Sequence, residues 1–126
     1  AFDPAQKYPL FVVIHGGPHG MWKDQFFLRW NYHLLASPGY VVLLTDYTGS
    51  TGYGEEFAQA IQGDPLATPA DEINQGADEA IAKFSYLDAT RQAAAYHADT
   101  RLALPDRGVR IAPPGRVGSN VDTGHT

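Results

Sequence analysis

The sequence predicts an α/β fold in which helices pack against a parallel β-sheet. Residues 9–14 and 41–46 are almost entirely apolar and rich in β-branched side chains, as is typical of strands that are buried on both faces. Segments with a helical spacing of apolar residues lie between and after them, and a third strand is expected to begin near Arg91. Strands and helices that alternate in this way build parallel sheets through right-handed crossovers.

Composition narrows the possible classes of function. The 126 residues carry a net charge of −5, which disfavours nucleic acid as a partner because phosphate binding requires a basic face. The chain has no cysteine, which excludes disulfides and thiolate metal sites, and no apolar run approaches the roughly 18 residues of a membrane span. Because the chain starts at Ala1 without a signal-peptide pattern, we expect a processed product or a piece of a longer protein. No feature assigns a cellular compartment.

The segment between the first two strands is expected to form a helix over about residues 25–36. Asp24 is placed to cap its first turn, and apolar side chains recur along one side at Phe27, Trp30, Leu34 and Leu35. The tripeptide Ser37-Pro38-Gly39 would end this helix, since proline and glycine both interrupt helical structure.

Two helical segments are expected after the second strand. The first is short and covers about Glu55 to Ile61. The second covers about residues 70–87, because Thr68-Pro69 offers a hydroxyl cap followed by proline at the first helical position. Its apolar residues recur every three or four positions, at Ile73, Ala77, Ala80, Ile81, Phe84 and Leu87.

A glycine-rich stretch follows each of the first two strands. In parallel sheets, ligands bind beyond the carboxyl ends of the strands, where both stretches are expected to lie. In the first, His15-Gly16-Gly17-Pro18, the glycines leave backbone N–H groups outside the strand ladder and let an oxygen approach closely. One half of the oxyanion hole of α/β-hydrolases is built in this way, and the alternative is a tight turn that only enters the next segment.

The second stretch, DYTGSTGYG, has a competing interpretation as a phosphate-binding loop. Its three glycines, Gly49, Gly52 and Gly54, are of the kind found where loops hold phosphates at a helix N-terminus. A dinucleotide site, however, follows the first strand of its fold and is completed by an acidic residue about 20 positions later. The next strand here begins only near Arg91 and carries no such residue, so we expect no nucleotide cofactor.

The two stretches, in this order and spacing, resemble the beginning of the catalytic domain of the prolyl oligopeptidase family. The resemblance runs from YPLFVVIHGGPHG through GYVVLLTDYTGSTGYGEEF to GDP and an amphipathic helix, and it covers residues 8–95. It is strongest to the dipeptidyl-peptidase and acylaminoacyl-peptidase branches. It implies a partial α/β-hydrolase fold and a serine peptidase that acts on short peptides. It also implies that the backbone N–H of Gly17, helped by Gly16, holds the oxyanion.

Two positions depart from the pattern of that family. His15 stands where some branches have a tyrosine that helps to stabilise the oxyanion, so no such hydroxyl is expected at this position. Thr48 replaces the arginine of the usual YRGSTGYG, so the ion pairs that this arginine makes cannot be assumed.

The nucleophile that the resemblance implies is missing from the sequence. In an α/β-hydrolase it stands on a G-x-S-x-G elbow directly after the next strand, here expected at residues 91–95. The chain instead continues with Tyr96-His97-Ala98-Asp99, and the motif occurs nowhere else, so Ser37, Ser50 and Ser85 all lack the required context. We therefore assign no catalytic residue, expect the domain to be truncated before the nucleophile elbow, and expect the chain to be inactive alone.

Two other groups of residues are excluded as sites. Ser119, Asp122 and His125 follow hydrolase order, but they lie within seven residues of a glycine-rich segment and cannot be held rigidly as a triad. His15 and His19 lie on a glycine turn rather than on a helix, so their spacing does not imply a metal site. We expect neither a metal nor another cofactor.

The composition divides the chain into residues 1–95, the N-terminal part of a peptidase domain, and residues 96–126, a non-native or disordered tail. The tail has four arginines, no lysine and no helical or strand period. A shifted reading frame, a chimera and a true divergence would each produce such a tail. Two hypotheses of function follow: a serine peptidase whose missing partner is the remainder of its own domain, or a non-catalytic module with a structural or binding role.

Overall fold

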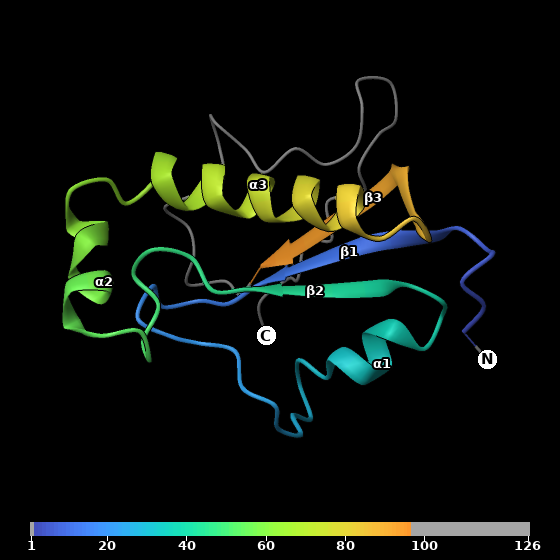
Figure 1. Cartoon of the computed structure of the whole chain (residues 1–126). Helices are drawn as coiled ribbons and strands as arrows, with labels where there is room; N and C mark the ends of the chain where they lie inside the picture. Colours follow the sequence, from blue (N-terminus) through green and yellow to red (C-terminus); the bar gives the residue numbers. More distant parts are fainter. Residues whose placement is uncertain (1, 97–126) are drawn as a thin grey trace.

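Three parallel strands form the centre of the computed structural model, which describes residues 2–96 (Figure 1). In chain order, the elements are strand β1 (Tyr8–Ile14), helix α1 (Tyr32–Ala36), strand β2 (Val41–Thr45), helix α2 (Glu55–Gln59), the 3-10 helix η1 (Ala60–Gln62), helix α3 (Ala67–Lys83) and strand β3 (Leu87–Tyr96). Apart from Tyr96, the tail expected at residues 96–126 lies outside the described residues.

The sheet has the strand order β2-β1-β3, with β1 in the middle. Val12 of β1 pairs with Leu43 of β2 on one side and with Ala94 of β3 on the other, and both pairings are parallel. The central strand is buried on both faces, which explains why its sequence is a continuous apolar run rather than an alternating one. The predicted parallel pairing of residues 9–14 with residues 41–46 is confirmed.

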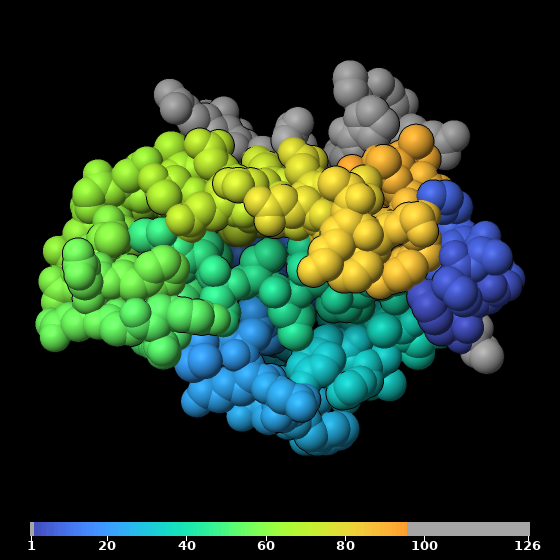
Figure 2. Space-filling model, in the orientation of Figure 1, coloured from blue at the N-terminus to red at the C-terminus, as the bar shows by residue number. Residues whose placement is uncertain are grey.

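Helices cover both faces of this sheet (Figures 1 and 2). Alternate residues of β1 point toward α3 and form the main core with it and with the loop after β2, in a cluster of Leu10, Val12, Ile14, Tyr47, Ile61, Ile73, Ala77 and Leu87. On the opposite face, α1 packs against β2, and the ring of Phe11 lies 5.7 Å from the ring of Tyr40.

The prediction of a helix over residues 25–36 is wrong for its first half, since only Tyr32–Ala36 is helical. The cap is Asn31, whose side-chain oxygen accepts a hydrogen bond from the backbone N–H of Leu34 at 3.1 Å. Asparagine favours the start of a helix over its interior, so Asn31 begins the helix in the middle of the predicted range. Asp24 instead accepts a hydrogen bond from the hydroxyl of Tyr32 at 3.1 Å.

Helix α3 is shifted toward the N-terminus relative to the expected residues 70–87. The carboxylate of Asp64 accepts hydrogen bonds from the backbone N–H groups of Ala67 and Thr68, at 2.9 and 3.0 Å, so Asp64 rather than Thr68 satisfies the first turn. At the other end, Phe84 has an extended backbone and Leu87 already belongs to β3. Leu87 has the helical spacing in the sequence but is buried by the sheet.

The remaining elements agree with the sequence. The short helix expected from Glu55 to Ile61 is present as α2 followed by η1. The third strand is present and begins at Leu87, earlier than Arg91, because a register shift opposite Pro9 and Leu10 lets it pair with the start of β1.

Candidate oxyanion site

Two loops meet beyond the carboxyl ends of β1 and β2, at the left of Figure 1. We call residues 15–20 the donor loop and residues 46–54 the glycine loop. Several hydrogen bonds join them; among these, the backbone N–H of Thr51 donates to the carbonyl of Gly20 at 2.8 Å, and Nδ1 of His19 donates to the carbonyl of Gly49 at 3.0 Å. The loops therefore form one unit at the edge where ligands bind in parallel sheets.

Gly17 occupies a position in the donor loop that only glycine fits. Its φ of +140° is rare for residues with side chains, and a Cβ there would lie 2.7 Å from the backbone nitrogen of His19. The residue is exposed. Among the described residues, the hydrogen bonds within this loop use the carbonyls of Gly16 and Pro18 and the N–H of Gly20, and none uses the N–H of Gly17.

The imidazole of His15 is buried between the loops and only 7% exposed. Its Nδ1 donates to the carbonyl of Gly16 at 3.0 Å, and its Nε2 lies 2.7 Å from the hydroxyl oxygen of Ser50. Because a carbonyl can only accept, the proton resides on Nδ1, and in the neutral ring Nε2 accepts from the Ser50 hydroxyl. The His15 side chain is therefore buried, with both ring nitrogens engaged inside the protein.

Tyr47 holds His15 from the side of the glycine loop. The two rings stack at a centroid distance of 4.6 Å, and the Tyr47 hydroxyl donates to the backbone carbonyl of His15 at 2.9 Å. Burial, and to a lesser degree the nearby carboxylate of Asp46, raises the pKa of Tyr47 to about 12. The phenol therefore stays neutral and able to donate throughout the physiological pH range.

Asp46, His15 and Ser50 lie close together but do not have the geometry of a catalytic triad. The Ser50 hydroxyl and the Asp46 carboxylate both contact the same ring nitrogen, Nε2, at 2.7 and 3.5 Å, whereas a triad uses opposite nitrogens. Ser50 is also completely buried, so no substrate can reach its hydroxyl. The Asp46 carboxylate accepts hydrogen bonds from the backbone N–H of Trp22 and the hydroxyl of Tyr53, at 2.9 and 2.8 Å. This cluster is a structural link between the loops.

Thr48 ties the glycine loop to helix α3. Its backbone N–H and its hydroxyl donate to the two carboxylate oxygens of Glu72, at 2.6 and 2.7 Å. A neutral side chain and a backbone N–H thus hold this carboxylate, without an ion pair from Thr48.

The two other serines considered from the sequence lie away from this site. The hydroxyl of Ser37 donates to the carbonyl of Leu34 at the end of α1, and Ser85 lies in the turn before β3, at the opposite end of the sheet. The group formed by Ser119, Asp122 and His125 lies outside the described residues. The donor loop holds Gly16 and Gly17, the residues that the sequence predicts for the site.

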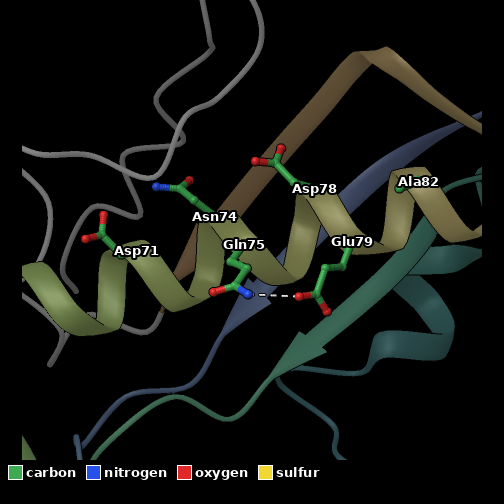
Figure 3. Close-up of a pocket in the computed structure, with 6 residues that line it drawn as sticks. All are labelled: Asp71, Asn74, Gln75, Asp78, Glu79 and Ala82. Atoms are coloured by element: carbon green, nitrogen blue, oxygen red, sulfur yellow. Dashed lines mark hydrogen bonds between the residues drawn. The ribbon is translucent and has the colours of Figure 1, made fainter.

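A surface pocket over α3 does not contribute to the site (Figure 3). Within residues 2–96, the lining comes from that helix alone and consists of Asp71, Asn74, Gln75, Asp78, Glu79 and Ala82. The side chain of Gln75 donates to that of Glu79 at 2.9 Å. Within residues 2–96, no group of three His, Asp or Glu side chains could hold a metal ion. In the same part of the chain, no helix is long and apolar enough to cross a bilayer.

Comparison with known proteins shows the family and the fold to which the chain belongs. The model of the prolyl oligopeptidase family matches residues 25–95. Dipeptidyl-peptidase 5 of Schizosaccharomyces pombe is 40% identical over 94 residues, which are 75% of this chain and 14% of that protein. Probable dipeptidyl-peptidase 5 of Aspergillus clavatus is 44% identical over 72 residues, which are 57% of this chain and 10% of that protein.

Solved structures show the same fold. The acylaminoacyl peptidase of Pyrococcus horikoshii superposes with a TM-score of 0.66 and 28% identity, over 76% of this chain and 15% of that one. An acylaminoacyl peptidase in complex with Z-Gly-Gly-Phe-chloromethyl ketone gives a TM-score of 0.69, with 28% identity and the same coverage. The described sheet and helices are thus part of an α/β-hydrolase domain, and the chain belongs to the prolyl oligopeptidase family.

Proposed function

We propose that residues 8–95 provide the oxyanion-stabilising part of a serine peptidase, with the backbone N–H of Gly17 as the donor and Gly16 in support. The observation that carries this proposal is the position of the Gly17 N–H and its lack of a partner within the donor loop. This N–H lies beyond the central strand, in an exposed loop conformation that only glycine fits, and takes no part in the hydrogen bonds of its loop.

The donor would act when a serine oxygen attacks the carbonyl carbon of a peptide bond. The carbonyl oxygen then takes up the negative charge of the tetrahedral intermediate, and an N–H aimed at that oxygen stabilises it more than the ground-state carbonyl. One such donor lowers the barrier by about 3–4 kcal/mol. The donor loop is tied to the glycine loop, so little reorganisation is needed during the reaction.

Short peptides are the proposed substrates of the complete enzyme. Several similar relatives are dipeptidyl-peptidases, and one structural relative was solved in complex with Z-Gly-Gly-Phe-chloromethyl ketone. The sequence contains no G-x-S-x-G motif, and Ser50 is buried with its hydroxyl on His15. We therefore propose that the 126-residue chain does not hydrolyse peptides by itself and that residues 96–126 are not part of the peptidase domain.

The source gene provides the first test. We expect that translation in all three frames beyond the codon for Ala95 reveals a G-x-S-x-G elbow within about ten codons. A protein that continues through that elbow should cleave short peptides and react with a fluorophosphonate probe. Absence of the elbow in every frame would contradict a shifted reading frame, and an unreactive serine in an intact elbow would contradict the peptidase assignment.

A non-catalytic module is the second candidate, and the exposed apolar side chains favour it. On the segment before α1, the side chains of Phe26 and Leu28 are 73% and 87% exposed. Large apolar side chains exposed in this way are typical of a surface that contacts another molecule. The fluorophosphonate probe also distinguishes the two hypotheses. Specific labelling of any serine in the 126-residue chain would exclude the non-catalytic alternative.

A further inference from the structure

The single methionine of the chain, Met21, lies where the donor loop and the glycine loop meet. The backbone on either side of it is bonded to the glycine loop. The carbonyl of Gly20 accepts from the N–H of Thr51 at 2.8 Å, and the N–H of Trp22 donates to the carboxylate of Asp46 at 2.9 Å. These two hydrogen bonds hold Met21 at the junction of the loops.

The thioether of Met21 covers Gly52 of the glycine loop. A Cβ added to Gly52 would lie 2.8 Å from the sulfur of Met21 and 3.0 Å from its terminal methyl carbon, so these two atoms occupy the space that a side chain at Gly52 would need. A flexible, polarisable thioether is well suited to fill an irregular gap of this kind. The contact is therefore the apolar part of a junction whose other described contacts are hydrogen bonds.

This contact is within reach of small molecules in the solvent. Met21 is only half-buried and Gly52 is exposed, and both residues lie in loops rather than in a helix or strand. Cysteine and methionine are the side chains that peroxides oxidise, and the chain has no cysteine. Met21 is therefore the side chain that a mild peroxide oxidises first.

We propose that Met21 is a site of reversible oxidation by peroxides, and that its sulfoxide releases the glycine loop from the donor loop. The sulfur attacks one oxygen of the peroxide, the O–O bond breaks as the S–O bond forms, and the other oxygen leaves as water. Sulfur gives up two electrons and the peroxide takes them up. Methionine sulfoxide reductases reverse the step with a dithiol, which becomes a disulfide while the oxygen leaves as water.

The release follows from the geometry around the sulfur. A sulfoxide is polar and chiral, and its oxygen requires hydrogen bonds that an apolar contact cannot provide. The space against Gly52 is already filled by the sulfur and the methyl group of Met21, so the added oxygen does not fit there. The side chain turns toward water, and the neighbouring hydrogen bond between Thr51 and Gly20 becomes exposed to solvent.

Two variants separate the position of the methionine from the chemistry of oxidation. Met21→Leu keeps a flexible apolar side chain of similar volume that peroxide does not oxidise. The second variant combines Met21→Leu with Leu28→Met, which moves the single methionine to a position that is 87% exposed in the wild type. It is the matched control, because its sulfoxide forms away from the junction.

Mass spectrometry of the 126-residue chain after treatment with dilute hydrogen peroxide tests the site. We expect the wild type to gain one oxygen, about 16 Da, at Met21, and Met21→Leu to gain none. Methionine sulfoxide reductases A and B together should remove it. A folded wild type that resists the peroxide dose which oxidises the control would overturn the site, and a sulfoxide that both reductases leave in place would contradict its reversibility.

Amide hydrogen exchange and thermal unfolding of the same samples test the release of the loop, without reference to the function proposed for Gly17. We expect oxidation of the wild type to speed exchange at Thr51 by about 10-fold, with little change at Val13 in β1, and to lower the unfolding midpoint by about 4 °C or more. The oxidised control should show neither effect. Unchanged Thr51 exchange and an unchanged midpoint in the oxidised wild type, or equal changes in the oxidised control, would overturn the proposal.

Discussion

Thr48 and Glu72 form a two-point contact between the glycine loop and helix α3, with the backbone N–H and the hydroxyl of Thr48 on the two oxygens of the carboxylate. The contact spans 24 residues of sequence and joins the loop to the helix. These two hydrogen bonds to a carboxylate attach the loop to the helix.

Removal of the Thr48 hydroxyl should destabilise the fold measurably. We expect Thr48→Val to lower the free energy of unfolding by about 1.5–3 kcal/mol, because a charged acceptor loses one of its two donors. Thr48→Ser keeps the hydroxyl and should lose much less. Urea denaturation followed by circular dichroism gives both values, and equal stability of the valine variant and the wild type would contradict the account of this contact.

Because of the backbone conformation of Gly17, we expect a single added methyl group to lower the stability of the fold strongly. We expect Gly17→Ala to cost about 1–3 kcal/mol, since alanine disfavours this conformation and its Cβ would collide with the backbone of His19. Gly39→Ala is the matched control, because Gly39 has a φ of +104° but nothing within 4 Å of the added Cβ. Chemical denaturation should show the larger loss for Gly17→Ala; a loss no larger than that of Gly39→Ala would refute the collision.

Because burial raises the pKa of Tyr47, we expect the protein to lose stability in alkali. Its pKa is about 12 in the folded protein and near 10 in the unfolded chain, so folding favours the neutral phenol. This contribution is complete below pH 10 and disappears as the pH rises from 10 to about 12. We expect Tyr47→Phe to remove this part of the pH dependence in thermal unfolding measured across that range. An identical alkaline profile in the variant would exclude Tyr47 as its source.

Because hydrogen bonds lower the pKa of Asp64, we expect the protein to lose stability in acid. Hydrogen bonds to the carboxylate, led by the backbone N–H of Ala67, lower the pKa of Asp64 below 3.8, so folding favours its charged form. The stabilisation is present above pH 3.8 and decreases as the pH falls through the lower, folded value. Asp64→Asn should flatten this part of the acid unfolding profile, whereas Asp71→Asn, on the exposed side of α3, should not. Equal profiles for the two variants would contradict the capping role.

The sequence predicted those elements whose signal is local and continuous. The apolar runs ending at Ile14 and Thr45 form strands because no polar residue interrupts them. Only β1 is buried on both faces, however, since β2 lies at the edge of the described sheet and is half-buried along its length. The start of α1 was missed because Asn31 caps a helix inside the predicted range, and the end of α3 was missed because Leu87 satisfies the helical spacing while packing in the sheet.

Within the candidate site, the sequence identified the glycines but not the side chains that hold them. The contact between His15 and Ser50 joins residues 35 positions apart, and that between Thr48 and Glu72 joins a loop to a distant helix. Such contacts arise from the way in which strands and helices pack, and no local pattern encodes them. The one available signal was that both glycine-rich stretches follow neighbouring parallel strands and so meet at the same edge.

The proposed stabilisation of an oxyanion by the N–H of Gly17 is best tested by measuring kcat for Gly17→Ala in a complete peptidase that carries residues 8–95. Gly39→Ala, in the turn before β2, again serves as the control for backbone strain. We expect kcat to fall by about 10²- to 10³-fold in Gly17→Ala, with KM little changed and with Gly39→Ala close to the unmodified enzyme. A kcat for Gly17→Ala within a few-fold of that for Gly39→Ala would contradict the proposed stabilisation.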